Sequence, residues 1–338
     1  MSQILLWLRH PCHKYYMAIK HNSVKRKVPL VTKTKRMKLA RTQWQLYLFL
    51  LLPIIYLILF KYVPMAGIQI AFKNFNARDG IWGSPWVGLK QFQNFFASYT
   101  FERVIGNTLR LSLYSILVGF PIPILFALIL NSISQRKFKK TVQTVTYMPH
   151  FISVVVLVGI VLQILNPRIG LYGTLYSLLN NGASPPDPMG SATAFPHIYI
   201  WSGIWQNFGW GSIIYIAALS GVDMQLHEAA QIDGASRFQR VIHIDFPSIL
   251  PTATIMLIMR TGHIMSIGFE KIYLMQNNLN LAASEIISTY VYKVGLSAGG
   301  NMNFSYSTAI DLFNSVVNLI LIILVNYLAG KMSETSLW

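Results

Sequence analysis

The chain has 338 residues, of which 53% are hydrophobic and only 12% are charged, and its formal net charge is +17. A soluble domain of this length would carry about a quarter charged residues, so the composition excludes an ordinary soluble protein and predicts a membrane protein. The single cysteine, Cys12, excludes an intrachain disulfide framework.

The positive charge is concentrated at the N-terminus, where residues 1–43 hold eleven Lys and Arg and neither Asp nor Glu. Beside a membrane span, such a tail is expected to contact anionic lipid or to set the topology, and we expect no nucleic-acid partner. The apolar run Ile4–Leu8 is too short to form the core of a signal peptide. Residues 1–43 are therefore predicted to form a basic tail in front of the membrane domain.

Long apolar segments follow this tail, and a bilayer crossing requires about 20 mostly apolar residues. Five segments satisfy this requirement: 44–63, 107–131, 142–165, 196–221 and 307–329. A sixth, 246–268, is weaker because it contains two prolines together with Arg260 and His263. Proline near the start of a span is tolerated, since the first helical turn has no intrahelical N–H partners to lose. The sequence thus predicts an all-α membrane protein with six transmembrane helices.

Six crossings place both termini on one side of the membrane, and the Lys and Arg distribution indicates which side. With the tail inside, the cytoplasmic segments hold 18 Lys and Arg and the outer segments hold 8. The positive-inside rule therefore places 1–43, the loop 222–245 and the C-terminal tail 331–338 in the cytoplasm, around a membrane domain over 44–330. If 246–268 did not cross, the C-terminus would lie outside, and the charge count alone does not exclude this.

The polar loop between the fourth and fifth spans carries the most specific pattern in the chain. Starting at Glu228, it reads EAAQIDGASRFQRVIHIDFPSILP. Asp223 is expected to cap a short amphipathic helix over 223–240, in which Gly234 permits a bend and Phe238 is a large anchor for a partner's pocket. Composition alone would favour a helix that lies on the lipid headgroups. The choice between this helix and a helix that contacts a partner therefore depends on the full pattern of residues.

That full pattern resembles the EAA loop of permease subunits in binding-protein-dependent ABC importers. The positions that carry the resemblance are Glu228, Ala229, Ala230, Asp233, Gly234, Ala235, Phe238, Ile242, Pro247 and Pro251. Three further stretches look like the same family: Asn107–Leu109, Tyr147–Pro149 and Trp205–Gly221. The ending Ser333–Trp338 is similar to a carbohydrate branch that includes LplB-like, aldouronate-type and alginate-type transporters. Because an EAA loop is followed by a crossing, the resemblance also implies that 246–268 spans.

The resemblance implies the type I permease fold of ABC importers and a transport subunit of a prokaryotic plasma membrane rather than an enzyme. The implied partners are a second homologous permease, two ATP-binding cassette ATPases and an extracytoplasmic solute-binding protein that delivers an oligosaccharide. The chain has no G-x-x-x-x-G-K-[ST] phosphate loop, so no cofactor is expected on it, and ATP and Mg²⁺ are implied on the partner ATPases. The implied ATPase-coupling residues are Glu228, Ala229, Ala230, Asp233, Gly234, Ala235 and Phe238.

Sugar sites combine aromatic faces with hydrogen-bonding groups, and three spans offer both at helical spacing. The candidate substrate-path residues are Trp201, Trp205, Asn207 and Phe208 in span four, Arg260 and His263 in span five, and Asp311, Asn314 and Asn318 in span six. Polar groups inside a membrane usually face the protein interior or a water-filled path. The cationic groups, Arg260, His263 and Arg110, raise the hypothesis of an acidic, uronate-type oligosaccharide.

Structural roles compete with these functional ones. Trp201 is equally consistent with an interfacial belt, Asn314 and Asn318 with helix–helix hydrogen bonds, and Arg260 with an ion pair to Asp311 that leaves no site. A histidine in span three, His150, is expected to be structural. The alternative functions are a permease for amino acids, peptides or metals, an intramembrane enzyme, and a channel or structural subunit without ATP coupling. No His/Cys/Asp/Glu cluster in the sequence has metal-ligand spacing.

Overall fold

The computed structural model describes residue 42, residues 44–296 and residues 302–332. Within these ranges the elements are helices, and the β-pairing is limited to one isolated bridge between Lys73 and Trp86. Nearly all of the predicted N-terminal tail and all but two residues of the C-terminal tail lie outside the described residues. The prediction of an all-α chain is therefore confirmed for the part that the structure describes.

The chain divides into two compact units, Met1–Met65 and Ala66–Trp338. The described part of the first unit holds three consecutive helical elements: α3 (Trp44–Leu57), the π-helix η2 (Ile58–Tyr62) and α4 (Val63–Met65). The second unit holds all the elements discussed below, starting with the 3₁₀ helix η3 (Ala66–Phe72). Short helices α5 (Gly80–Gly83) and α6 (Lys90–Phe96) follow η3.

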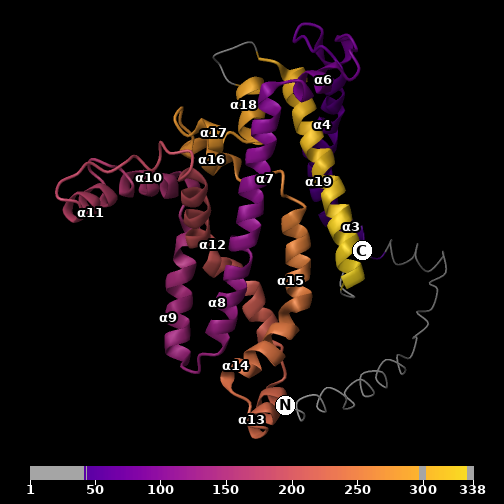
Figure 1. Cartoon of the computed structure of the whole chain (residues 1–338). Coiled ribbons are helices and arrows are strands. Elements are labelled where there is room, and N and C mark those ends of the chain that lie inside the picture. The colour runs from indigo at the N-terminus through magenta and orange to yellow at the C-terminus, as the bar shows by residue number, and fades with distance from the viewer. Residues whose placement is uncertain (1–41, 43, 297–301, 333–338) are drawn as a thin grey trace, which may run out of the picture. The chain divides into compact units, whose positions relative to one another are not determined.

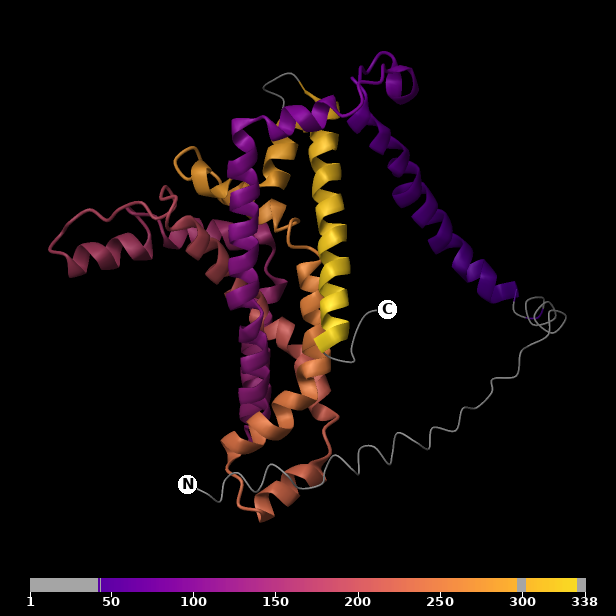
Figure 2. The same ribbon diagram turned by 45° about the vertical axis from the view of Figure 1, so that its right-hand side comes forward.

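The second unit has further helices, and most of them form the bundle seen in Figures 1 and 2. They are α7 (Tyr99–Gly119), α8 (Pro121–Asn131), α9 (Arg136–Tyr147), the 3₁₀ helix η4 (Met148–Phe151), α10 (Val154–Ile164), α11 (Leu171–Leu179), α12 (Phe195–Ser220), α13 (Met224–Ile232), α14 (Arg237–Arg240), the π-helix η5 (Val241–Asp245), α15 (Phe246–Thr261), α16 (Phe269–Met275), α17 (Leu281–Ser284), α18 (Ile287–Leu296) and α19 (Phe304–Met332).

Among the described residues, four helical stretches are long and apolar enough to cross a bilayer. They are Trp44–Phe72, Tyr99–Asn131, Arg237–Thr261 and Phe304–Lys331. The third of these contains most of the weak fifth span. By length and composition, this stretch qualifies as a crossing helix even though it contains Arg260 and two prolines.

The segment predicted as the third span, 142–165, is not one straight helix in the structure. Helices α9 and α10 meet at an angle of 98°. Pro149 lacks the backbone N–H that would continue the helix, and the Ser153 side chain caps α10 by accepting a hydrogen bond from Val156 N at 3.3 Å. The span therefore divides into two helices at the Tyr147–Pro149 motif, and Figure 1 shows α10 running away from the bundle towards α11.

Helix α12 lies at the centre of the bundle, where it contacts α7, α8, α9 and α15. It has 26 residues but is not among the most apolar stretches, because polar side chains such as Gln206 and Asn207 interrupt it. A helix surrounded by protein does not need an apolar face on every side. At Gly209 the backbones of α12 and α9 come so close that a Cβ would lie 2.6 Å from the carbonyl carbon of Thr146.

The Asn107–Leu109 motif fastens the connection between α17 and α18 onto α7. Asn107 Nδ2 donates to the carbonyls of Ala282 and Glu285 at 2.9 and 3.0 Å, and Thr108 Oγ1 accepts from Ile287 N at 3.1 Å. The buried carboxylate of Glu285 forms ion pairs with Arg103 and Lys293. This motif of the sequence therefore has a packing role at one end of the bundle.

Candidate functional site

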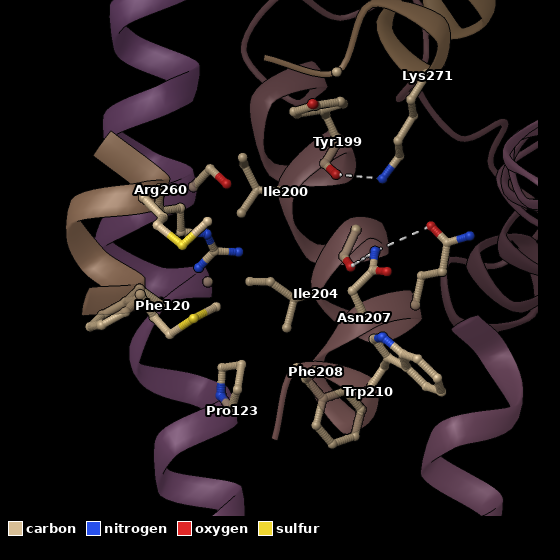
Figure 3. A pocket seen from close by; sticks show the side chains of 18 of the residues that line it. Phe120, Pro123, Tyr199, Ile200, Ile204, Asn207, Phe208, Trp210, Arg260 and Lys271 are labelled. Carbon is tan, nitrogen blue, oxygen red and sulfur yellow. Dashed lines mark hydrogen bonds between the residues drawn. The ribbon is translucent and has the colours of Figure 1, made fainter. Parts of the chain in front are cut away.

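A cavity of about 600 Å³ lies inside the second unit, beside the central helix α12. Its walls come from α7, α8, α10, α12, α15 and α16, and Figure 3 shows the side chains around it. Aromatic lining residues are Phe120, Tyr199, Phe208, Trp210 and Tyr215. Aromatic rings with a few polar groups are the usual lining of a site for a small organic ligand. We refer to this space as the central cavity.

Two cations, and among the described residues no carboxylate, line the central cavity. Arg260 comes from the last turn of α15, and Figure 3 shows its guanidinium pointing into the cavity. Within the described part of the chain, Arg260 has no ion pair or hydrogen bond. The postulated pair with Asp311 is therefore absent. The space that admits the guanidinium is next to Gly119, where a Cβ would lie 3.8 Å from both terminal nitrogens of Arg260.

The second cation, Lys271, comes from α16, between two of the candidate spans. It is buried, its Nζ donates a hydrogen bond to Tyr199 O at 2.8 Å, and its Nζ lies 4.9 Å from the centroid of the Tyr199 ring. Burial lowers the pKa of Lys271 to about 8, because removing the ammonium from water disfavours its charged form. Gly203 leaves room for the ammonium group, since a Cβ there would lie 3.1 Å from Nζ.

The sequence does not reveal Lys271 as a cavity residue, since it is simply one of the eight Lys and Arg of the outer segments. No periodicity marks a lysine in a seven-residue helix, so the sequence carries no signal that would have placed it in the cavity. Tyr199 was missed as well, although it lies two residues before the aromatic series that was singled out. The positions of the neighbouring helices are needed to tell which face of α12 borders the central cavity.

At the other end of the cavity, His150 packs against Trp210 and holds Asn207. The imidazole and indole rings stack with centroids 4.5 Å apart and planes within 4° of each other. His150 Nδ1 lies 2.9 Å from Asn207 Oδ1, and since the Asn207 amide nitrogen donates to Gly203 O, the imidazole is the donor. This arrangement matches the structural role expected for His150, and it positions two lining residues, Asn207 and Trp210.

Three of the predicted path residues line the cavity: Asn207, Phe208 and Arg260. The other six lie outside its lining: Trp201, Trp205, His263, Asp311, Asn314 and Asn318. Trp201 and Trp205 are 52% and 47% exposed, on a different part of the α12 surface. Spacing placed them on one face with Phe208, but Phe208 turns towards α8, where its ring centroid lies 5.1 Å from that of Phe126.

Asn318 serves as a link between helices in the structure. Its Oδ1 accepts from Met265 N at 3.0 Å, and its Nδ2 donates to Ser266 Oγ at 2.8 Å. These bonds tie α19 to the irregular stretch after α15. Asn314 is buried, and its Oδ1 has no hydrogen-bond partner in the described residues.

The EAA-like segment forms a second distinct feature, at one end of the bundle (Figure 1). As expected, Asp223 caps α13 by accepting a hydrogen bond from Gln225 N at 2.9 Å. The single helix predicted over 223–240 is instead two helices. Gly234 adopts the left-handed conformation with φ +81° and follows the end of α13, and a capping box between Ser236 and Gln239 starts α14.

Although the sequence of this segment is polar overall, its surface exposes large apolar side chains. Ile232 is 86% exposed and Phe238 is 73% exposed, and Glu228 is exposed on α13. The same segment presents the other EAA positions: Ala229, Ala230, Asp233, Gly234 and Ala235. Large apolar side chains gathered on an exposed loop are typical of a contact with another protein.

Residues 101–334 match the profile of the family described as the inner membrane component of binding-protein-dependent transport systems. The chain belongs to this family. The predicted resemblance is thereby confirmed over most of the sequence, and the chain is a membrane-embedded permease. Among the described residues of this permease, no group of three or more His, Cys, Asp or Glu is placed to hold a metal ion.

The named relatives of this permease include saccharide transport permeases. It is 39% identical to Protein LplB of Bacillus subtilis (strain 168) over 318 residues, which covers 93% of this chain and 98% of the relative. It is 42% identical to YteP of the same organism, a polygalacturonan/rhamnogalacturonan transport system permease protein, over 90% of this chain and 94% of the relative.

Solved structures agree with the sequence relatives. The permease matches a chain of a bacterial ABC transporter involved in the import of the acidic polysaccharide alginate, with a TM-score of 0.81 and 37% identity over 88% of this chain and 99% of that one. A second structure of a bacterial alginate ABC transporter, in complex with an alginate pentasaccharide-bound periplasmic protein, matches with the same TM-score. The predicted fold class, an ABC importer permease, is confirmed by this similarity.

Proposed function

We propose that this chain is a membrane-spanning subunit of an ATP-driven importer that moves an oligosaccharide into the cytoplasm. The observation that carries the proposal is the central cavity, whose aromatic lining and Arg260, which has no partner among the described residues, suit a sugar chain. The relatives that import polygalacturonan, rhamnogalacturonan and alginate support a carbohydrate substrate. Identifying the ligand on the cognate solute-binding protein, and then reconstituting uptake with it, tests this function. An amino acid, peptide or metal ion as the ligand would contradict it.

The proposed assembly contains a second homologous permease, two ATPase subunits and the solute-binding protein. ATP and Mg²⁺ would bind the ATPases. The proposed topology has a membrane domain over 44–330 with six crossings in a prokaryotic plasma membrane, and it places 1–43, 331–338 and the loop 222–245 in the cytoplasm. The complex of an alginate transporter with its periplasmic protein supports a solute-binding partner for this chain.

The exposed EAA-like segment is the proposed contact with the ATPases. Phe238→Ala is expected to reduce the amount of ATPase that co-purifies with the permease by about tenfold or more, because truncating an aromatic hot-spot residue of an interface typically costs about 2 kcal/mol or more. Glu228→Gln is expected to weaken the same contact by removing its charged group. Quantitative co-purification from detergent-solubilised membranes measures both effects.

Phe138→Ala is the matched control for Phe238→Ala. Phe138 is also an exposed phenylalanine, 53% accessible, but it lies on α9 and outside the EAA-like segment. It should leave ATPase recovery unchanged. Equal losses for the two variants would mean that the contact is not centred on the EAA-like segment.

An acidic, uronate-type substrate is the more specific part of the proposal. Arg260 and Lys271 converge on the central cavity without a carboxylate among the described lining residues, so the lining is positively charged. A cation in a cavity with little water attracts a carboxylate more strongly than the same cation at an exposed surface. Arg110 and His263, which were expected to add to this charge, do not line the cavity.

Uptake of an acidic oligosaccharide should depend on the charge of Lys271. With a pKa of about 8, the ammonium is protonated below that pH and loses its proton as the pH rises through it. Uptake of a uronic oligosaccharide is therefore expected to fall through about pH 8 relative to uptake of a neutral one. Proteoliposome uptake measured over a pH series checks this, with Lys271→Arg as the variant that stays charged. A fall of the same size in that variant would contradict the assignment.

The competing functions have less support in the structure. An intramembrane enzyme would need the ionisable groups Arg260, His263 and Asp311 to be gathered in one place. Only Arg260 lines the central cavity. A channel without ATP coupling would have no use for the exposed apolar surface around Phe238.

A further inference from the structure

The carboxylate of Asp245 lies where three segments of the chain meet. It is 3% exposed, at the junction of η5 and α15. Asn131, the last residue of α8, donates from Nδ2 to Asp245 Oδ1 at 3.3 Å. His227, in the middle of α13, places Nε2 at 3.3 Å from the same oxygen. One oxygen atom therefore contacts side chains from α8 and α13 while its backbone leads directly into α15.

Each of these three helices has a separate part in the proposed transport cycle. Helix α13 carries Glu228 and the other EAA positions. Helix α8 contributes Pro123 to the central cavity, and α15 contributes Met256 and Arg260. The contacts of Asp245 thus connect the segment that would meet the ATPase with two walls of the cavity.

The chemistry of this junction differs from ordinary packing between helices. An apolar cluster that contains Ile124, Tyr215 and Ile249 already holds α8, α12 and α15 together. A buried carboxylate lowers the stability of the fold unless polar partners compensate for its lost hydration. Holding the helices together therefore does not by itself explain why a carboxylate lies at this junction. Hydrogen bonds and ion pairs are directional, and they fix the orientation of α13 relative to the ends of α8 and α15.

We propose that Asp245 is a positioning residue for energy coupling, which fixes α13 to the ends of α8 and α15 through Asn131 and His227. Displacement of α13 by an ATPase then moves two cavity walls together. This inference rests on the proposed function, because it assumes that an ATPase acts on the EAA-like segment. Removing the polar contact should leave ATP hydrolysis running while less sugar is moved for each ATP.

The test uses the complete transporter in proteoliposomes, with its solute-binding protein and its ATPases. The readout is the number of sugar molecules imported per ATP hydrolysed. His227→Ala is expected to lower this ratio by about tenfold, within the range by which residues between coupled sites change coupling. Asp245→Asn should lower it to a similar extent, and the double variant should be no worse than either single one, since both remove the same contact.

His243→Ala is the matched control, because His243 lies in the same loop but contacts the backbone carbonyl of Gln239 instead of Asp245. It should leave the ratio unchanged. Asn131→Ala provides a second way to break the junction if Asp245→Asn fails to assemble. Recovery of the assembled complex and its melting temperature are measured for every variant.

Variants that lose assembly or thermal stability but keep the wild-type ratio would show that the junction is only structural and would overturn the inference. Additive losses in the double variant would also overturn it. The failure of the proposed function looks different, because then the wild-type complex itself would import no sugar. A wild-type complex that imports sugar with a ratio sensitive to His227 but not to His243 supports both.

Discussion

Arg260→Ala is expected to lower uptake of a uronic oligosaccharide by about 10- to 100-fold, while uptake of a matched neutral oligosaccharide changes little. The guanidinium points into the central cavity without a partner among the described residues, so it is available to a substrate carboxylate. A hydrogen bond to a charged group typically contributes about 1.5–3 kcal/mol, which corresponds to this range. Initial uptake rates in proteoliposomes, with the loaded solute-binding protein at saturating concentration, measure the difference.

Arg260→Lys separates charge from geometry in the same experiment. A lysine keeps the positive charge but cannot form the planar, two-pronged contact with a carboxylate, so an intermediate rate is expected. Equal transport of acidic and neutral oligosaccharides by the wild type, with Arg260→Ala harmless, would remove the basis for an acidic substrate. A uniform loss for both substrates would assign Arg260 to packing instead.

Gly209→Ala should have the largest effect on stability. The added Cβ would lie 2.6 Å from the carbonyl carbon of Thr146 and closer still to its oxygen, and a backbone atom cannot rotate out of the way as a side chain can. Overpacking a well-packed interior usually costs about 1–3 kcal/mol and at times more. The variant should therefore give less monodisperse protein and a lower melting temperature in detergent, because α12 and α9 can no longer meet.

Gly159→Ala provides the control for this substitution. Gly159 also lies within a helix, α10, but a Cβ there meets nothing within 4 Å. Its melting temperature should stay the same or rise slightly, since alanine favours helix more than glycine does. If the two variants behaved alike, the close approach of α12 to α9 would not limit stability.

The features that the sequence predicted well depend on residues that are close together along the chain. Asp223 caps α13 because the cap is decided by residues two or three positions away, and the EAA-like pattern was recognisable since it occupies one continuous stretch. The break at Gly234 was anticipated only as a possible bend. Glycine permits several conformations, and the capping box of Ser236 decides between them.

What the sequence predicted poorly depends on neighbours far along the chain. Spacing showed that Trp201 and Trp205 share a face of α12, but α12 has protein on several sides, so spacing could not show which face borders the cavity. Arg260 was ambiguous between Asp311 and a substrate path until the positions of α15 and α19 were known. The path of the chain between α15 and α18 is what places Lys271 in the cavity. No repeat or periodicity in the sequence predicts this path.

The stack between His150 and Trp210 has a consequence for how a sugar chain would travel. With an imidazole parallel to the indole at 4.5 Å, one face of the Trp210 ring system is already covered. A pyranose ring in the cavity would therefore find a platform on one side only, rather than a sandwich between two aromatic rings. A ring supported on one side can slide to the next register without leaving an enclosed slot, so this arrangement favours stepwise passage of an oligosaccharide over tight retention of a single sugar unit.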